Sequence, residues 1–144
     1  MPRIDLASAQ AFIDALPHSR ALGMRVEDVG PGVVTVSMAW DARFVGDPTT
    51  GVIHGGAVSA LMDTCGGTAV FSLPEAQGTA TIDLRIDYMR PATPGQRIRA
   101  RAECYHATRT VAFVRAMAMD DAGEDAPVAT ASGAFTLERG KAAP

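Results

Sequence analysis

The sequence predicts an α+β fold in which an antiparallel β-sheet packs around one long helix. Several segments alternate apolar and polar residues, which is the period of a strand with one buried face. One stretch between them, over residues 57–73, is instead small and apolar almost throughout. Gly and Pro clusters such as Gly30-Pro31-Gly32 separate the segments. Strands and turns around one buried helix are typical of a layered α+β domain.

The N-terminal part is expected to form a short helix followed by a hairpin. Over residues 8–16 the large apolar side chains share one side of a helix, and Ser8 is the expected N-cap. Strands over 21–29 and 33–40 then flank the Gly-Pro-Gly turn. Residues 41–50 are expected to form a loop.

The long helix carries two adjacent glycines, Gly66 and Gly67, in its interior. Each costs about 1 kcal/mol relative to alanine in a helix, so their presence indicates close approach of another backbone. Pro74 ends the helix.

The remaining strands are expected over residues 79–90, 96–105, 110–119 and 128–137. In the first of them Ile82, Leu84, Ile86 and Tyr88 alternate with charged residues, so these four are expected on one face. Gly123 lies in the expected hairpin over 120–124.

Length and charge favour one ordinary globular domain over residues 1–144, with the N-terminal helix within 1–17 and a flexible tail over 139–144. A chain of this size buries roughly 68–70% of its unfolded surface. The net charge of −3 gives no basic signal for a nucleic acid or an anionic membrane as partner.

Targeting and metal-binding patterns are absent from the sequence. No apolar run approaches the roughly 18 residues that span a bilayer, and the N-terminus lacks the apolar region of a signal peptide, so a cytoplasmic location is expected. Cys65 and Cys104 are expected as small buried hydrophobic residues. The three histidines have no paired spacing, so no metal site is expected.

A His-Gly-Gly motif at residues 54–56 directly precedes the long helix, and Asp63 follows nine residues after His54. Glycines let backbone N–H groups approach a ligand, and the first N–H groups of a helix have no partner inside it. The helix dipole adds positive potential there, which stabilises an oxyanion. Asp63 lies among apolar residues, where it is either satisfied by a hydroxyl of Thr64 or Thr68 or used as a general base or nucleophile.

Two motifs together resemble the hotdog-fold acyl-CoA thioesterases of the phenylacetate-pathway (PaaI) type. The first is Gly51-x-x-His-Gly-Gly with Asp63 in the helix, and the second is Tyr88-x-x-Pro91 with Gly95 shortly after it. The matches run from about Val45 to Gly95, and the strand pattern continues to residue 137. The resemblance implies a hotdog fold and hydrolysis of an acyl- or aryl-CoA thioester to a free acid and coenzyme A. It implies no cofactor, because coenzyme A is part of the substrate.

The resemblance also implies roles for individual residues. Asp63 would act as general base or nucleophile, and the Gly55 amide would donate to the thioester carbonyl. His54 would shape the turn and the substrate pocket, and Gly56 would belong to the same turn. Thr81, at the family position of a small hydroxyl residue, would bind the nucleophilic water or the substrate.

One position departs from the family pattern. Several relatives carry an Asn six residues before the His, where this chain has Pro48, which has no side-chain donor. Asp47 or Thr50 is the candidate to fill that role. Three further residues fall where relatives contact coenzyme A, and a guanidinium suits its phosphates: Arg90, Arg109 and Thr110.

The resemblance further implies a homodimer, or a tetramer made of two dimers. Each site would lie across the dimer interface, with Gly55 from one chain and Asp63 and Thr81 from the other. Two alternatives stay open at this point: a non-catalytic acyl-CoA binding module, and a hotdog dehydratase or hydratase. The residues leave the acyl group open.

Overall fold

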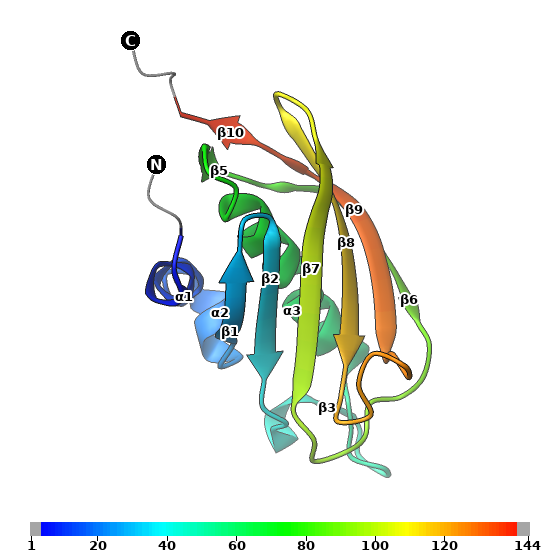
Figure 1. The fold of residues 1–144 in the computed structure, drawn as a ribbon. Coiled ribbons are helices and arrows are strands. Elements are labelled where there is room, and N and C mark those ends of the chain that lie inside the picture. Colours follow the sequence, from blue (N-terminus) through cyan, green and yellow to red (C-terminus); the bar gives the residue numbers. More distant parts are fainter. Residues whose placement is uncertain (1–3, 141–144) are drawn as a thin grey trace.

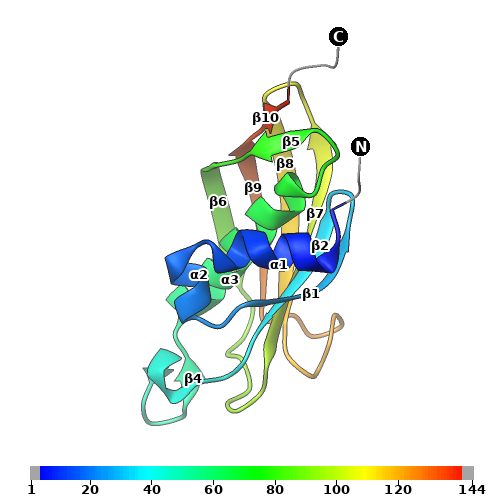
Figure 2. The same ribbon diagram turned by 90° about the vertical axis from the view of Figure 1, so that its left-hand side faces the viewer.

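The computed structural model describes residues 4–140 and consists of a six-stranded sheet with one long helix along one face (Figures 1 and 2). The helix is α3 (Gly55–Phe71), and the strand order is β1-β2-β7-β8-β9-β6, with every neighbouring pair antiparallel. The strands are β1 (Arg25–Gly30), β2 (Val33–Met38), β6 (Thr81–Tyr88), β7 (Ile98–Ala107), β8 (Val111–Met119) and β9 (Ala129–Thr136). The predicted α+β class and the hotdog arrangement are confirmed.

Several short elements complete the chain. They are α1 (Leu6–Asp14), α2 (Pro17–Ala21), the 3₁₀ turn η1 (Ala42–Phe44), β3 (Val45–Asp47), β4 (Val52–Ile53), β5 (Ala76–Gly78) and β10 (Glu138–Arg139). Two small antiparallel pairs, β3–β4 and β5–β10, lie outside the main sheet. The sequence predicted none of α2, β3, β4, β5 and β10, because elements of two to five residues are too short to show a period.

Both predicted helices begin earlier than expected. The N-cap of α1 is Asp5, whose Oδ1 accepts the Ser8 N–H at 2.8 Å, so the assignment of Ser8 as the cap is wrong. The long helix begins at Gly55, and His54 is its N-cap. Gly55 and Gly56 therefore belong to the first helical turn and not to a turn that precedes the helix.

The glycines in α3 allow the helix to lie close to the sheet. A Cβ atom on Gly66 would lie 2.8 Å from Cζ of Phe135, a distance that real Cβ atoms do not show. The predicted close approach is confirmed, but the neighbour is the ring of Phe135 from β9 and not a backbone. Cys65 lies in the same core, fully buried, and burial raises the pKa of its thiol to about 12. Cys104 is only half-buried, so its predicted burial holds in part.

Strand β6 forms one edge of the sheet, and among the described strands it pairs only with β9. Its register shifts between Thr81 and Asp83, and Ile82 is 56% exposed as a result, contrary to its expected place on one face with Leu84 and Ile86. Tyr88 at the far end of β6 is 52% exposed. The edge therefore offers free backbone groups and apolar side chains.

The C-terminal part is ordered further than the sequence predicted. Arg139, expected in the flexible tail, lies in β10, and its guanidinium donates to the carbonyls of Thr108 and Arg109 and pairs with Glu75. Residues 141–144 of the predicted tail and 1–3 of the predicted N-terminal segment lie outside the described part. Among the helices within residues 4–140, none combines the length and the hydropathy that a bilayer crossing requires.

Candidate active site

The first turn of α3 presents one open amide. Nδ1 of His54 accepts the Gly56 N–H at 2.7 Å, and the Ala57 N–H donates to the His54 carbonyl at 2.9 Å. Gly55 is exposed, and its N–H has no acceptor within residues 4–140. Because the other amides of this turn are bonded, the positive end of the helix dipole is available to a ligand through Gly55.

The sequence of the motif explains this geometry. A Cβ atom at position 56 would lie 2.8 Å from His54 Nδ1, so the capping bond requires glycine there. At position 55 a Cβ atom would lie 3.5 Å from the Tyr88 ring, which is ordinary contact. The Tyr88 hydroxyl donates to the Gly55 carbonyl at 2.7 Å and places its ring over the turn.

Asp63 lies about two turns further along α3 and is half-buried. Its Oδ1 accepts the hydroxyl of Thr81 at 2.6 Å. The alternative in which Thr64 or Thr68 satisfies this carboxylate is wrong, because Thr64 Oγ1 lies 3.2 Å from Ser19 Oγ and the Thr68 hydroxyl donates to the Thr64 carbonyl. Asp63 and Thr81, which the resemblance assigns to one site, thus lie in direct contact, a hydrogen bond that the sequence did not predict.

Two separate cavities adjoin these groups. A cavity of about 420 Å³ is lined by Asp63, Thr81, His18 and the apolar residues Leu84 and Ile86. Another of about 460 Å³ lies beside Gly55, and its lining is largely apolar, with Arg90 as its one charged residue: Val52, Ile53, Val58, Tyr88, Met89, Arg90, Pro91, Ala92 and Val128.

The two candidate catalytic groups do not meet within one chain. Gly55 and Asp63 are eight residues apart on a continuous helix, which is about 12 Å along the axis at 1.5 Å per residue. The N–H of Gly55 also points along the axis away from Asp63, as amides do at a helix N-terminus. A single thioester cannot accept from Gly55 and lie within hydrogen-bond reach of a water on Asp63 in the same chain.

The candidates for the missing Asn bond to each other. Asp47 Oδ2 accepts the Thr50 hydroxyl at 2.9 Å, and Oδ1 accepts the Thr49 N–H at 3.0 Å. The Thr50 hydrogen bond is the main reason that the pKa of the Asp47 carboxyl lies below its usual value. Both residues are exposed in the β3–β4 turn, and neither hydrogen-bonds to the first turn of α3 within residues 4–140.

The candidates for coenzyme A contact lie in two places. Arg90 is bound by Asp120 through two hydrogen bonds of 2.7 and 2.8 Å, so its guanidinium is already engaged. Arg109 and Thr110 lie in the turn between β7 and β8, at the opposite end of the sheet from β3 (Figure 1). In one chain that turn is therefore far from the start of α3.

Sequence reasoning missed two residues of this region, His18 and Asp120, and one contact, that of the Tyr88 hydroxyl. His18 of α2 lines the Asp63 cavity, Tyr88 bonds Gly55, and Asp120 binds Arg90. The Tyr-x-x-Pro motif drew attention to Tyr88 but not to its hydroxyl bond. No spacing in the sequence links Arg90 with Asp120, because the contact depends on how two distant loops meet.

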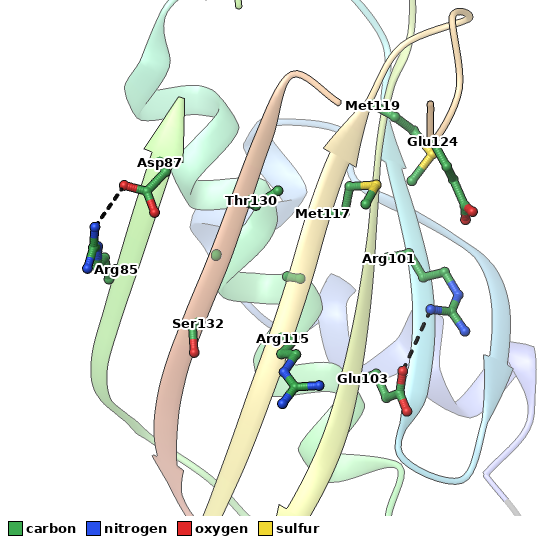
Figure 3. Close-up of a pocket in the computed structure, with 12 residues that line it drawn as sticks. Arg85, Asp87, Arg101, Glu103, Arg115, Met117, Met119, Glu124, Thr130 and Ser132 are labelled. Carbon is green, nitrogen blue, oxygen red and sulfur yellow. Dashed lines mark hydrogen bonds and ion pairs between the residues drawn. The ribbon is translucent and has the colours of Figure 1, made fainter. Parts of the chain in front are cut away.

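A third hollow, of about 520 Å³, lies on the sheet face away from α3 (Figure 3). Four of its charged side chains form pairs along the strands, with Arg85 and Asp87 at 3.3 Å and Arg101 and Glu103 at 3.9 Å. None of the predicted catalytic residues lines it. Within residues 4–140, no group of three or more potential ligands could hold a metal ion.

Comparisons with a family model and with known proteins point to the same family. The model of the thioesterase superfamily matches residues 50–126, more than half of the chain. A protein of Halobacterium salinarum that is named as an esterase is 37% identical over 90 residues, which cover 60% of this chain and 60% of that relative. The chain thus matches less than two thirds of that relative's length. The medium/long-chain acyl-CoA thioesterase YigI of Escherichia coli is 28% identical over 120 residues, covering 74% of this chain and 77% of YigI.

Solved structures agree with this family. A crystal structure of a Pseudomonas aeruginosa protein superposes with a TM-score of 0.81 at 39% identity, covering 92% of this chain and 98% of that one. A mutant of the phenylacetic acid degradation protein PaaI from Thermus thermophilus gives a TM-score of 0.74 at 29% identity, covering 85% of this chain and 100% of that one.

Proposed function

The chain belongs to the thioesterase superfamily and is a thioester hydrolase of the PaaI type, and from this premise we propose that it hydrolyses acyl-CoA thioesters at a site shared between two chains. The observation that carries this proposal is the position of the two functional groups. The open Gly55 amide and the Asp63–Thr81 pair lie at opposite ends of β6, the free edge strand.

The proposed reaction needs only water and the thioester. The Gly55 N–H donates to the thioester oxygen and stabilises the negative charge that develops there. Asp63 either removes a proton from the attacking water or attacks the carbonyl carbon itself to give a mixed anhydride that water then hydrolyses. In both cases the C–S bond breaks, the acid is released, and coenzyme A leaves as the thiol. No cofactor takes part.

Pairing of two β6 edges would bring the separated groups together. Antiparallel pairing places the start of one strand opposite the end of the other. Thr81 begins β6 and holds Asp63, whereas Tyr88 ends β6 and touches Gly55. A symmetric dimer of this kind therefore has two sites, each with Gly55 of one chain and Asp63 and Thr81 of the other. It also brings the turn with Arg109 and Thr110 toward the partner's Gly55.

The substrate is proposed to be an acyl-CoA with an apolar acyl group. YigI is named for medium- and long-chain acyl-CoA, and the cavity beside Gly55 is lined mainly by aliphatic side chains. Release of coenzyme A from phenylacetyl-, hydroxybenzoyl-, medium-chain and long-chain acyl-CoA tests the proposal. We expect turnover of at least one class. Binding of acyl-CoA without release would support the binding module, and hydration of an enoyl-CoA would support the hydratase.

Complementation between two inactive variants tests the shared site. Co-refolding equal amounts of Gly55→Val and Asp63→Asn chains should give mixed dimers with one intact and one doubly defective site. Random assortment then restores up to about a quarter of the wild-type activity. Verified mixed dimers without recovered activity, or a monomer in sedimentation, would contradict the shared site.

The matched control mixes wild-type chains with chains that carry both substitutions. With shared sites, each mixed dimer has one defect in each site, so only wild-type dimers work and about a quarter of the sites are active. If each site lay within one chain, this mixture would retain about half of the activity, and the two single variants would restore none.

A further inference from the structure

Asp120, outside the candidate active site, is a buried carboxylate with an unusually full set of donors. It is 2% exposed and follows β8 directly. Arg90 donates from Nη2 to Oδ1 at 2.7 Å and from Nη1 to Oδ2 at 2.8 Å. The backbone N–H and the hydroxyl of Thr93 donate to Oδ2 at 3.0 and 2.9 Å, and the Ala122 N–H donates to Oδ1 at 3.0 Å. A buried charge requires partners of this kind.

Arg90 is equally occupied. Its Nε and Nη2 donate to the Ala126 carbonyl at 3.1 and 2.7 Å, and Nη1 also donates to the Pro91 carbonyl at 3.1 Å. With the two bonds to Asp120, these contacts match the five N–H donors of a guanidinium. No donor remains for a phosphate of coenzyme A.

The pair ties two loops together. The loop between β6 and β7 contains Arg90 and Thr93, and the loop between β8 and β9 contains Ala122 and Ala126. Both loops lie at the end of the sheet where β3 lies (Figure 1). The N–H groups of Met89 and Arg90 add bonds of 2.8 and 3.3 Å to the Val128 carbonyl.

The segment from Tyr88 to Ala92, which these hydrogen bonds hold in place, forms part of the cavity beside Gly55. The lining of that cavity includes the whole segment, Arg90 among its residues, together with Val52, Gly55 and Val58. The Tyr88 hydroxyl bonds the Gly55 carbonyl across it. A shift of the segment would therefore move Tyr88 relative to the amide that is proposed to bind the thioester.

We infer that Arg90 and Asp120 are positioning residues, which hold the segment from Tyr88 to Ala92 against Gly55 and do not contact coenzyme A. The effect on kcat that we expect from this role rests on the proposed function. The Arg90 guanidinium also holds the pKa of the Asp120 carboxyl well below its usual range, so the pair stays ionised at neutral pH.

Kinetics with two substrates separate positioning from coenzyme A binding. We expect Asp120→Asn and Arg90→Lys to lower kcat about tenfold or more, because misplacement by 1 Å can cost roughly 100-fold. The loss should be the same for an acyl-CoA and for the matching acyl-N-acetylcysteamine thioester, which lacks the nucleotide. The control Asp121→Asn changes the neighbouring exposed carboxylate, whose nearest cation is Arg99 at 3.9 Å, and should leave kcat unchanged. A rise in KM that is confined to the acyl-CoA, with kcat unchanged, would overturn the inference.

Hydrogen exchange tests the same inference without any activity. Asp120→Asn should speed amide exchange in residues 89–93 and also in residues 52–58 around the start of α3, whereas Asp121→Asn should change neither. Faster exchange confined to the two loops would refute positioning of Gly55. Hydrogen exchange can be measured even if the wild type hydrolyses no thioester. Failure of the inference can therefore be distinguished from failure of the proposed function. If circular dichroism shows that Asp120→Asn does not fold, the kinetic and hydrogen-exchange measurements are made with Arg90→Lys, which keeps the positive charge.

Discussion

Replacing Asp63 by asparagine is expected to lower kcat by at least about 100-fold, the lower end of typical acid–base contributions, while the chain stays folded. Asparagine has nearly the same shape, and its Oδ1 can still accept the Thr81 hydroxyl that Asp63 accepts at 2.6 Å. It can neither take a proton from water nor attack the thioester. The loss should therefore lie in turnover and not in stability, as measured by steady-state kinetics and thermal unfolding.

Asp14→Asn is the matched control for this prediction. Asp14 is also a helical aspartate whose Oδ1 accepts one side-chain donor, Gln10 Nε2 at 2.9 Å, but it lies in α1 and lines none of the cavities described above. It should keep wild-type turnover. A folded Asp63→Asn enzyme with near wild-type kcat would refute the catalytic role of Asp63.

The main sheet and the long helix could be predicted because their signals are local. In β7, Ile98, Ala100 and Ala102 are buried and alternate with more exposed charged residues, which is what period two requires. In the same way, the His-Gly-Gly motif and an acid nine residues later lie within one stretch of sequence. Asp63 and Thr81 could be assigned to one site in advance only through the family resemblance, and their hydrogen bond was not predicted.

Contacts that depend on tertiary packing could not be predicted. Arg90 and Asp120 are separated by 30 residues, and they meet only because the sheet places the two loops at one end. The family resemblance therefore implied that Arg90 contacts coenzyme A, whereas its donors are all occupied. Similarly, the bulge beside Thr81 turns Ile82 out of the expected alternation, since one extra residue shifts the register.

The departure at Pro48 makes the backbone at Gly55 more important in this chain. Relatives with an Asn there have a second donor for the carbonyl, but Asp47 and Thr50 bond to each other in the β3–β4 turn. Polarisation of the thioester is then proposed to depend mainly on one amide and on the helix dipole behind it. Substitutions at Gly55 should accordingly have large effects.

Gly55→Val is expected to lower kcat by roughly 100- to 1,000-fold, because the added side chain would keep the thioester oxygen away from the backbone N–H, and loss of one oxyanion donor typically costs about 2.7–4 kcal/mol. A Cβ atom at this position lies 3.5 Å from the Tyr88 ring, so alanine fits, whereas valine adds two methyl groups to a Cβ atom that already contacts the ring. Gly55→Ala should therefore be less impaired than Gly55→Val. The helix itself should form in both variants, because Gly55 does not have a positive φ.

Gly30→Val supplies the control for Gly55→Val, because it is the same substitution at a glycine in β1 with no atom within 4 Å of the added Cβ and without a positive φ. It should keep both fold and turnover. Measuring kcat with a saturating acyl-CoA separates crowding of the binding cavity, which raises KM, from loss of carbonyl polarisation, which lowers kcat. Equal kcat values for Gly55→Val and Gly30→Val would contradict stabilisation of the oxyanion by the Gly55 amide. The proposed polarisation of the thioester carbonyl by this amide would then be refuted.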